Sequence, residues 1–300
     1  MRVVIIGGRG MIGRALAHLA ASGGHEVILL SRKAPSPHPG VTKTVTLQWD
    51  GKDVESLADI LDGMDAVVNL AGESIGKGRW TSNRKDAILQ SRLEPASALV
   101  DAILLCKRPP KTLVQASAVG VYGTGTETML ESSNPGSDFL ARLAVQWEGS
   151  TKKVESHGVR RVVIRTGLVL QKGEGVLPQL MMPFQFLVGG PTGTGKQFYS
   201  WIHIEDEVGA ILFLLENPAC NGVYNLTAPN PCSNEEFGKT LARILKKPYW
   251  LPLPGVALKL VLGEMSTLVL EGQRVLPYRL QEAGYDFKFP TLEAALKDLL

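Results

Sequence analysis

The feature that most constrains this chain is a glycine-spaced turn close to its start. Residues 3–16 read VVIIGGRGMIGRAL, in which a short apolar run meets glycines at positions 7, 10 and 13 and an amphipathic run follows. The pattern predicts a strand, a tight turn and a helix, the geometry that points backbone N–H groups at a pyrophosphate. Because glycines also join strands to helices for purely structural reasons, the turn needs support from its surroundings.

The next apolar run supplies that support and indicates which nucleotide binds. HEVILLS (residues 25–31) is followed by Arg32 and Lys33, with no carboxylate where NAD-specific sites place Asp or Glu. A carboxylate would repel a 2′-phosphate, whereas Ser31 can donate to it and Arg32 can bind it with a fork of N–H groups. Arg9, a bulky cation inside the glycine turn, could close over the same phosphate or stack on the adenine. The alternative is that Arg32 and Lys33 are solvated loop cations; we predict an NADP(H) site.

A second turn of small residues closes a later apolar run, DAVVNLAG (residues 65–72). Such a turn lets the chain pass beneath the nucleotide ribose without a side-chain clash, although a plain strand-end turn would look the same. The candidate cofactor contacts from these three segments are Gly7, Arg9, Gly10, Met11, Ile12, Gly13, Ser31, Arg32, Asn69, Leu70, Ala71 and Gly72.

Apolar runs alternate with helical patterns through the first half of the chain. Near-continuous Val, Ile and Leu runs are typical of parallel strands that are covered on both faces. The predicted strands are residues 2–8, 25–31, 65–72, 111–123 and 160–170, with 41–49 as a further strand or edge element. The predicted helices are residues 11–22, 53–62, 81–106 and 138–157. We therefore predict a Rossmann-type α/β fold with a doubly wound parallel sheet.

The composition of the chain changes after Gly167, and residues 171–200 contain many glycines and prolines. WIHIEDEVGAILFLLEN (residues 201–217) reads as the end of a strand that enters a helix, and residues 222–228 read as another short strand. We predict an NADP-binding domain at 1–170 with 201–228 returning to the sheet, and a small substrate-binding lobe at 171–200 and 229–300. Such a lobe would lie over the carboxyl ends of the strands, where open α/β sheets bind ligands.

Composition narrows the possible partners. A net charge of +3 over 300 residues is too weak to favour nucleic acid or a membrane surface, which leaves a small molecule. The three cysteines, Cys106, Cys220 and Cys232, are scattered and form no C-x-x-C, so we expect neither disulfides nor a metal site. No apolar run approaches the ~20 residues that span a bilayer. We expect a cytoplasmic protein, and its oligomeric state is left open.

With these pieces in place, the chain resembles the short-chain dehydrogenase/reductase superfamily, on the side of its extended, sugar-nucleotide epimerase-like members. The resemblance is most specific to an atypical, epimerase-family subgroup of NADP-dependent oxidoreductases of unknown substrate. The motifs that carry it are NLAGESI (69–75), RW (79–80), KDAILQSRLE (85–94), SAVGVYG (117–123), GGPTGTGKQFYSWIHIEDEVGAI (189–211), YNLTAP (224–229) and EGQRVLPYRLQEAGYDF (271–287). It implies the fold, an NADP(H) site and cofactor contacts from Ser31, Arg32, Asn69, Leu70 and Arg92.

The catalytic pattern of that superfamily is missing. Its members use a Tyr and a Lys on one helix, because a neighbouring ammonium lowers the pKa of the phenol enough for proton transfer. Residues 138–157, the helix expected to carry the pair, contain no tyrosine. Anchored on the usual Trp-Glu of the helix middle, the alignment puts Leu140 and Ala144 at the two positions.

Other groups are therefore candidates for the chemistry. Ser117 lies five residues before Tyr122, one more than usual, and would orient a substrate oxygen. Tyr122, at the end of the central strand, and His203, at the start of a helix, are the candidate proton donors. Each has a structural alternative, since a strand-end tyrosine often packs and a lone histidine often serves the fold.

Candidate substrate contacts are Glu73, Arg79, Trp80 and Trp201. Glu73 and Arg79 could recognise substrate, or they could simply pair with each other. The leading function is an NADPH-dependent oxidoreductase acting on a small carbonyl or alcohol. Two alternatives remain: a non-catalytic NADP(H)-binding sensor, and an epimerase-like enzyme acting on a nucleotide sugar.

Overall fold

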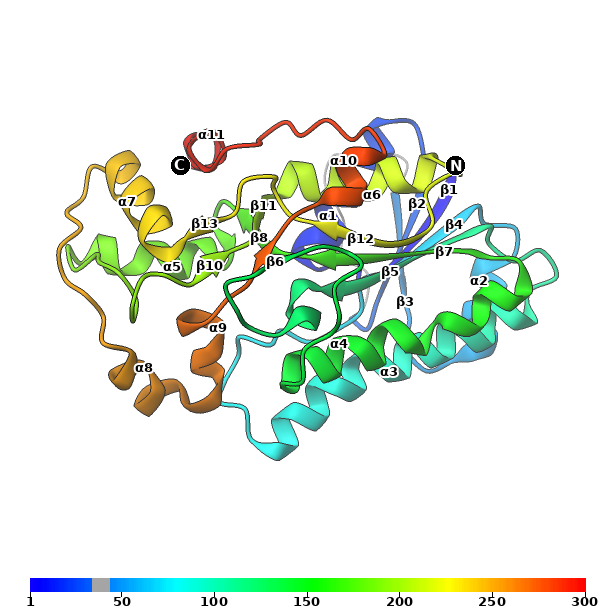
Figure 1. Cartoon of the computed structure of the whole chain (residues 1–300). Helices are drawn as coiled ribbons and strands as arrows, with labels where there is room; N and C mark the ends of the chain where they lie inside the picture. Colours follow the sequence, from blue (N-terminus) through cyan, green and yellow to red (C-terminus); the bar gives the residue numbers. More distant parts are fainter. Residues whose placement is uncertain (34–43) are drawn as a thin grey trace.

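The computed structural model describes residues 1–33 and 44–300. Its centre is a seven-stranded parallel sheet with the order β12-β7-β5-β4-β1-β2-β3 (Figure 1). The strands are β1 (Arg2–Ile6), β2 (Glu26–Ser31), β3 (Thr44–Gln48), β4 (Ala66–Asn69), β5 (Thr112–Ala118), β7 (Arg160–Thr166) and β12 (Gly222–Leu226). The strand order reverses between β1 and β4, so their carboxyl ends form the crevice in which such sheets bind ligands. The predicted doubly wound fold is confirmed.

Helices cover both faces of the sheet, as the alternating pattern predicts. On one face α1 (Met11–Ser22) packs beside α6 (Ile204–Glu216), and their apolar sides form a common core with strands that include β1 and β7. On the other face α2 (Val54–Leu61) and α3 (Ser82–Leu105) build a second core with the opposite side chains of the same sheet, and α4 (Phe139–Ser150) packs beside α3 (Figure 1).

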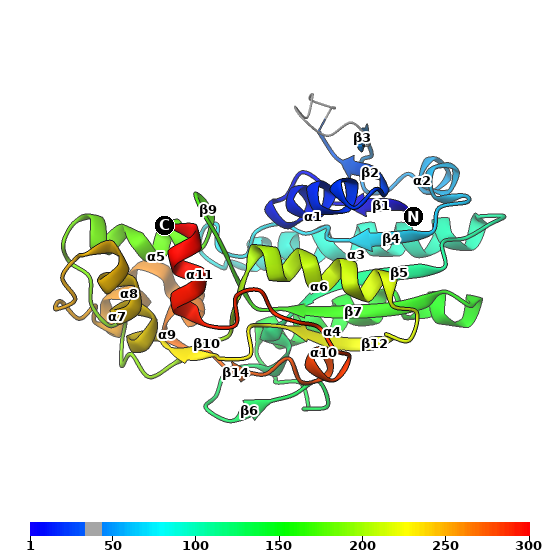
Figure 2. The same ribbon diagram turned by 90° about the horizontal axis from the view of Figure 1, so that it is seen from above.

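The remaining elements gather mainly at the carboxyl ends of the strands (Figure 2). Their shared core includes Trp201 and Phe237. The helices there are α5 (Leu177–Gln185), α7 (Asn234–Leu245), α8 (Gly255–Leu262), α9 (Thr267–Leu270) and α11 (Leu292–Leu299). The short strands are β8 (Leu168–Gln171), β9 (Glu174–Gly175), β10 (Phe198–Tyr199), β11 (Trp201–His203) and β13 (Cys232–Ser233), which pair as β11-β8-β9 and β10-β13.

Part of the segment 229–300, all of which was predicted to belong to the lobe, packs against the main sheet instead. α10 (Tyr278–Glu282) packs against β12, and Tyr285 and Phe287 join the core beneath α6. A short parallel pair, β6 (Thr128–Met129) with β14 (Arg274–Val275), also ties this returning segment to the sheet side. The division into a nucleotide domain and a lobe stays a prediction.

One predicted helix is shorter than expected, and the start of one predicted strand lies outside the described residues. The helix predicted at 138–157 ends at Ser150, and a 3₁₀ helix (Lys152–His157) follows, closed by the left-handed Gly158. The strand predicted at 41–49 is described only from Thr44, since residues 34–43 lie outside the described chain. In the described part of the chain, none of the helices is long and apolar enough to cross a bilayer.

Candidate functional site

The glycine turn between β1 and α1 depends on close backbone contact. Gly7 has a φ of +80°, and a Cβ placed there would lie 2.8 Å from the carbonyl oxygen of Leu70. A Cβ on Gly13 would lie 2.8 Å from the carbonyl oxygen of Gly7. Only glycine satisfies both constraints, because any side chain would push the turn away from β4 or from the helix start. The structure therefore brings the glycine turn and the turn at 69–72 together, as expected.

The start of α1 is open to an anion. Gly10 is the N-cap residue in an extended conformation, and it supplies no side-chain hydrogen bond to the helix. The first turn carries no acidic residue, so no carboxylate competes for the N–H groups of Met11, Ile12 and Gly13. Arg14 donates to the carbonyl oxygen of Arg9, which ties the turn to the helix.

The carboxyl end of β2 presents hydroxyl and cationic groups. Ser31 Oγ accepts a hydrogen bond of 3.2 Å from the backbone N–H of Lys33, and the carbonyl oxygen of Arg32 accepts one from Gln48 Nε2. The Arg32 and Lys33 side chains are exposed, while Ser31 is half-buried. This arrangement suits a 2′-phosphate chemically, since it offers donors and positive charge without a carboxylate.

Arg92 and Asn69 line the inner side of the nucleotide region. Asn69 is fully buried, donates to Gln115 Oε1 (2.9 Å) and accepts from the N–H of Ala71 (3.2 Å), which fixes the turn after β4. Arg92 is 9% exposed, stacks on Trp147 with 4.8 Å from its Cζ to the ring centroid, and would touch a Cβ on Gly72.

The guanidinium of Arg92 has spare hydrogen-bonding capacity. Its Nη atoms donate to the carbonyl oxygens of Ile88 (2.9 Å) and Glu73 (3.1 Å), but its buried Nε has no hydrogen-bond partner among the described residues. Burial lowers the pKa of Arg92 to about 10, which still leaves it cationic at neutral pH. A buried cation with an unused donor is a fitting partner for an electron-rich ligand group.

A cavity of about 490 Å³ opens between the strand ends and the lobe. Its sheet side includes Ala118 at the end of β5, Thr166 at the end of β7, and Arg92. Its lobe side is formed by side chains of α5, α7, β10 and the α9 region. The main apolar lining residues are Ile75, Trp80, Val119, Phe139, Leu140, Leu143, Trp147, Leu168, Val176, Leu180, Phe184, Phe198, Phe237, Leu241, Leu253, Leu268 and Val269. The volume lies in the range of small-molecule sites.

The two positions at which the superfamily pattern places its Tyr and Lys face this cavity. Leu140 and Ala144 lie one turn apart on α4, and both line it. The site therefore has apolar side chains where the usual proton-transfer pair would stand. Chemistry of the usual kind cannot start from these two residues.

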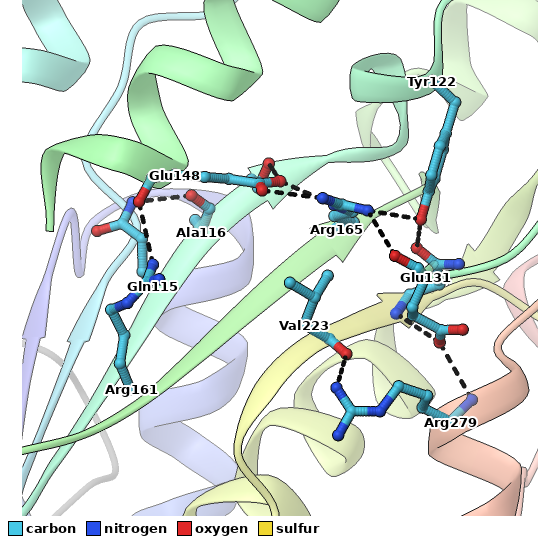
Figure 3. Close-up of polar contacts among 11 residues, drawn as sticks. Gln115, Ala116, Tyr122, Glu131, Glu148, Arg161, Arg165, Val223 and Arg279 are labelled. Atoms are coloured by element: carbon cyan, nitrogen blue, oxygen red, sulfur yellow. Dashed lines mark hydrogen bonds and ion pairs between the residues drawn. The ribbon is translucent and has the colours of Figure 1, made fainter. Parts of the chain in front are cut away.

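Ser117 and Tyr122 belong to a buried polar chain, and Figure 3 shows its part from Glu148 through Arg165 to Tyr122. Ser117 Oγ donates to Glu148 Oε1 (2.7 Å), and Glu148 accepts from Arg165 through both its oxygens (2.8 and 2.9 Å). Arg165 Nη1 donates to Tyr122 Oη (2.9 Å), and that hydroxyl donates to Asn225 Oδ1 (2.7 Å). Burial raises the pKa of Tyr122 despite the nearby guanidinium.

Neither Ser117 nor Tyr122 is among the residues that line the cavity. Their hydroxyls have partners within the fold, and these hold β5, α4, β7 and β12 together. Their roles in orienting substrate and donating a proton stay predictions, and the geometry does not support them.

His203 is the N-cap of α6. Its Nδ1 accepts from the N–H of Glu205 (3.1 Å), its Nε2 lies 3.4 Å from Asp298 Oδ2, and its ring contacts Phe289. It is 1% exposed, burial lowers its pKa, and it does not line the cavity. The structural alternative named for this histidine therefore fits its surroundings better than the role of proton donor.

The four candidate substrate contacts separate in space. Trp80 lines the cavity and packs edge-on against Phe139, with its indole N–H donating to the carbonyl oxygen of Ile75. Glu73 pairs with Arg84 at 2.5 Å, and not with Arg79, the alternative partner named for it.

The other two contacts have partners elsewhere in the fold. Arg79 donates to the carbonyl oxygens of Leu260 and Val261 at the end of α8. Trp201 is fully buried and donates to the carbonyl oxygen of Asn230, so the geometry does not support a direct substrate contact.

Two residues that the sequence did not single out meet at the cavity. Thr166 lines it, and its Oγ1 donates to Glu207 Oε1 at 2.7 Å. Glu207 on α6 has no exposed surface, and its Oε2 has no hydrogen-bond partner among the described residues. Burial raises the pKa of Glu207 to about 8, and the hydrogen bond with Thr166, which lowers the pKa, offsets only part of this rise. The available sequence signal for Glu207 was the presence of an acidic residue in a helix that is otherwise largely apolar.

The chain is similar in sequence to a known protein family over most of its length. The model described as the NAD dependent epimerase/dehydratase family matches residues 3–227, and a domain of unknown function, DUF1731, matches residues 253–299. The epimerase family protein YfhF of Bacillus subtilis is 40% identical over 100% of this chain and 98% of its own.

Two solved structures share both fold and sequence. The human epimerase family protein SDR39U1 (isoform 2), crystallised with NADPH, is 38% identical, with a TM-score of 0.89 over 100% of this chain and 99% of its own. A structure titled nucleoside-diphosphate sugar epimerase from Corynebacterium glutamicum is 34% identical, with a TM-score of 0.80 over 100% of this chain and 58% of its own.

Proposed function

The chain belongs to the NAD dependent epimerase/dehydratase family, and on that premise we propose that it is an NADP(H)-dependent oxidoreductase. Its substrate would be a carbonyl compound, or the corresponding alcohol, held in the cavity between the sheet and the lobe. The observation that carries the proposal is the position of this cavity. It shares Arg92 with the nucleotide region and reaches the ends of β5 and β7, at the crevice where such sheets bind ligands.

The residues present fit NADP(H). Gly7 and Gly13 leave room that a Cβ would fill, and the open start of α1 offers N–H groups to the pyrophosphate. Ser31 and Arg32 would hold the 2′-phosphate, and the unused Nε of Arg92 is available to the part of the cofactor nearest the cavity. The human relative crystallised with NADPH supports this choice of cofactor.

When bound, NADPH supplies the hydride that reduces a carbonyl carbon. The carbonyl oxygen then needs a proton, and the usual tyrosine is replaced by Leu140. In this proposal Glu207 starts as the neutral acid and its 2.7 Å hydrogen bond with Thr166 reverses. Glu207 gives its proton to Thr166 Oγ1 as the Thr166 hydroxyl gives its own to the substrate oxygen, which leaves Glu207 as a carboxylate that must take up a proton before the next turnover. The Leu140 and Ala144 side chains exclude water from the same wall.

Purified protein with NADPH and a panel of aldehydes and ketones tests the function, with cofactor oxidation followed by absorbance. The sharper test is Glu207→Gln, which keeps the shape but cannot supply a proton. We expect its turnover to fall ~100-fold or more, together with loss of the decline in turnover that we expect of the wild type as pH rises through about 8. Glu205→Gln, an exposed neighbour on the same helix, is the matched control. Equal turnover and pH profiles in all three proteins would reject Glu207 as the proton source.

A second candidate is a non-catalytic NADP(H)-binding sensor. The apolar residues Leu140 and Ala144 at the positions of the proton-transfer pair favour it, since a sensor needs the nucleotide site alone. Tight NADPH binding with no cofactor oxidation across the panel would support the sensor and reject the oxidoreductase.

A further inference from the structure

The lobe end of the cavity differs chemically from the end that meets the sheet. Its walls include Val176, Leu180 and Phe184 from the α5 region and Phe237 and Leu241 from α7. Phe184 and Phe237 are almost fully buried, and Leu241 is completely so, which makes this wall a part of the lobe's own core. A ligand seated here exchanges water for hydrocarbon, which favours apolar groups.

Three of the polar side chains at this end, Asn234, Tyr199 and Ser200, already have hydrogen-bond partners. Asn234 Nδ2 donates to Tyr199 Oη (2.9 Å), and Asn234 Oδ1 accepts from the N–H of Thr192 (2.9 Å). Ser200 Oγ donates to the carbonyl oxygen of Gln273 and accepts from the N–H of Val275. A sugar needs free donors and acceptors for its hydroxyl groups, and these residues have little to offer.

The charges around the cavity do not suit a nucleoside diphosphate either. Among the described residues that line it, Arg92 is the only cation, and it lies at the nucleotide end beside Gly72. The other charged lining residues are the carboxylates Asp138, Glu264 and Glu271. Glu264 is paired with Lys85 at 2.5 Å, so that lysine is not free to bind a phosphate.

One helix start at the lobe wall, that of α7, is closed to anions as well. At the N-terminus of α7, Ser233 and Glu236 form a reciprocal capping box, and Glu235 and Glu236 both lie in the first turn. The N–H groups that would hold a phosphate are thus taken in part by the cap, and two carboxylates repel a third negative charge. This start contrasts with that of α1, which has neither a side-chain cap nor an acidic residue in its first turn.

We propose that the cavity takes a neutral carbonyl compound with an extended alkyl or aryl body, whose carbonyl lies at the Thr166 end and whose body fills the lobe end. The inference rests on the proposed function, since it names the substrate class of the same site. It sets this chain apart from enzymes that seat a nucleotide sugar between sheet and lobe.

A homologous series of straight-chain 2-alkanones, from butanone to 2-decanone, tests the proposal by calorimetric titration of the protein saturated with NADP⁺. Burial of each added methylene makes the binding free energy more favourable by about 0.8 kcal/mol. This corresponds to ~4-fold tighter binding per methylene until the cavity is full. UDP-glucose is the contrasting ligand and should not bind. Binding of UDP-glucose, or an affinity that does not change with chain length, would overturn the proposal.

A variant pair locates the alkyl body. Leu180→Glu puts a carboxylate into the lobe wall, and we expect the affinity for 2-decanone to fall more than tenfold while NADPH affinity stays unchanged. Gln185→Glu adds the same charge on the same helix, at an exposed residue that does not line the cavity, and should behave as wild type. Leu180→Thr is a milder second variant if Leu180→Glu fails to fold. Unchanged 2-decanone binding in a folded Leu180 variant contradicts the placement.

These titrations, together with the NADPH oxidation assay on the same compounds, separate this inference from the proposed function. Alkanones that bind with the expected length dependence, but never cause NADPH oxidation, reject the oxidoreductase and leave the ligand class standing. Reduction of short and long carbonyl compounds with equal affinity rejects the ligand class and leaves the oxidoreductase standing.

Discussion

The nucleotide turn and the cavity beside it are built by different means. At the turn, the shape depends on the absence of side chains. A Cβ on Gly7 or on Gly13 would lie only 2.8 Å from a backbone carbonyl oxygen, so glycine allows the backbone segments to approach each other. At the cavity, the shape comes from side chains that are present, contributed by α4, β7, α5 and α7 and far apart in sequence. A turn of adjacent residues is specified locally, whereas a wall of distant side chains exists only once the chain has folded.

The two regions also treat charge differently. The nucleotide region keeps its donors open, with an uncapped helix start and an exposed Arg32. The cavity side closes its polar groups in pairs, such as Ser117 with Glu148 and Asn234 with Tyr199. Glu207, which pairs with the cavity residue Thr166, is an exception, because one of its oxygens has no partner in the described chain. On the proposed function, cofactor binding and proton transfer would therefore depend on separate sets of residues.

The largest expected effect tests that exception through stability. Burial raises the pKa of Glu207 from its usual 4.5 to about 8, so the folded state holds the proton more tightly than the unfolded chain does. Its contribution is fully present below pH 4.5 and is lost as pH rises through about 8. The loss amounts to at most about 5 kcal/mol, at 1.4 kcal/mol per pKa unit. Denaturant unfolding between pH 5 and 9 measures it.

Glu207→Gln should remove most of this pH dependence, because the amide is neutral throughout. Glu205→Gln, at the exposed neighbour, should leave the curve as in the wild type. If the wild type is equally stable at pH 5 and pH 9, Glu207 does not titrate as its burial indicates.

The next effect tests the claim that the nucleotide turn is shaped by absent side chains. Gly13→Val would force atoms into the contact with Gly7 and Gly8, and overpacking of this kind costs up to about 3 kcal/mol, or 100-fold in NADPH affinity. Gly125→Ala is the control, since nothing lies within 4 Å of its Cβ position. Fluorescence titration with NADPH measures both. Retention of wild-type affinity by Gly13→Val would mean that the cofactor binds elsewhere.

The difference between the regions explains what could be predicted from the sequence. The fold, the glycine turn and the small-residue turn at 69–72 follow from runs of adjacent residues, and the structure confirms that Gly7 and Leu70 meet. The absence of the Tyr-Lys pair was also readable, because Leu140 and Ala144 occupy fixed positions on one helix.

The rest depends on tertiary contacts that no local pattern contains. Tyr122 stands at a strand end, but the 3₁₀ turn at Val119–Tyr122 takes its hydroxyl toward Arg165 and Asn225. The sequence left open a pairing of Glu73 with Arg79, but in the structure Glu73 forms an ion pair with Arg84 on α3. Thr166 and Glu207 are 41 residues apart and become partners only when α6 packs against the sheet.

A smaller effect tests the cofactor assignment. Arg32→Ala removes the group that would hold the 2′-phosphate, and a charge-assisted hydrogen bond of this kind contributes about 1.5–3 kcal/mol. NADPH affinity should therefore fall ~10-fold or more, while NADH, which lacks the phosphate, should bind as before. Titration of both cofactors against wild type and variant makes the comparison internal. Equal losses for the two cofactors would show that Arg32 acts on something other than the 2′-phosphate.

The smallest effect asks whether Tyr122 belongs to the fold or to the chemistry. Tyr122→Phe leaves Arg165 Nη1 and Asn225 Oδ1 each without one buried partner, which costs about 1–3 kcal/mol of stability. Because its hydroxyl is buried away from the cavity, turnover per folded molecule should stay within a factor of two or so of wild type. Urea unfolding and turnover, measured on the same preparation, separate the outcomes. A variant that unfolds like the wild type but turns over 100-fold more slowly would return Tyr122 to the role of proton donor, and Thr166 with Glu207 would lose it.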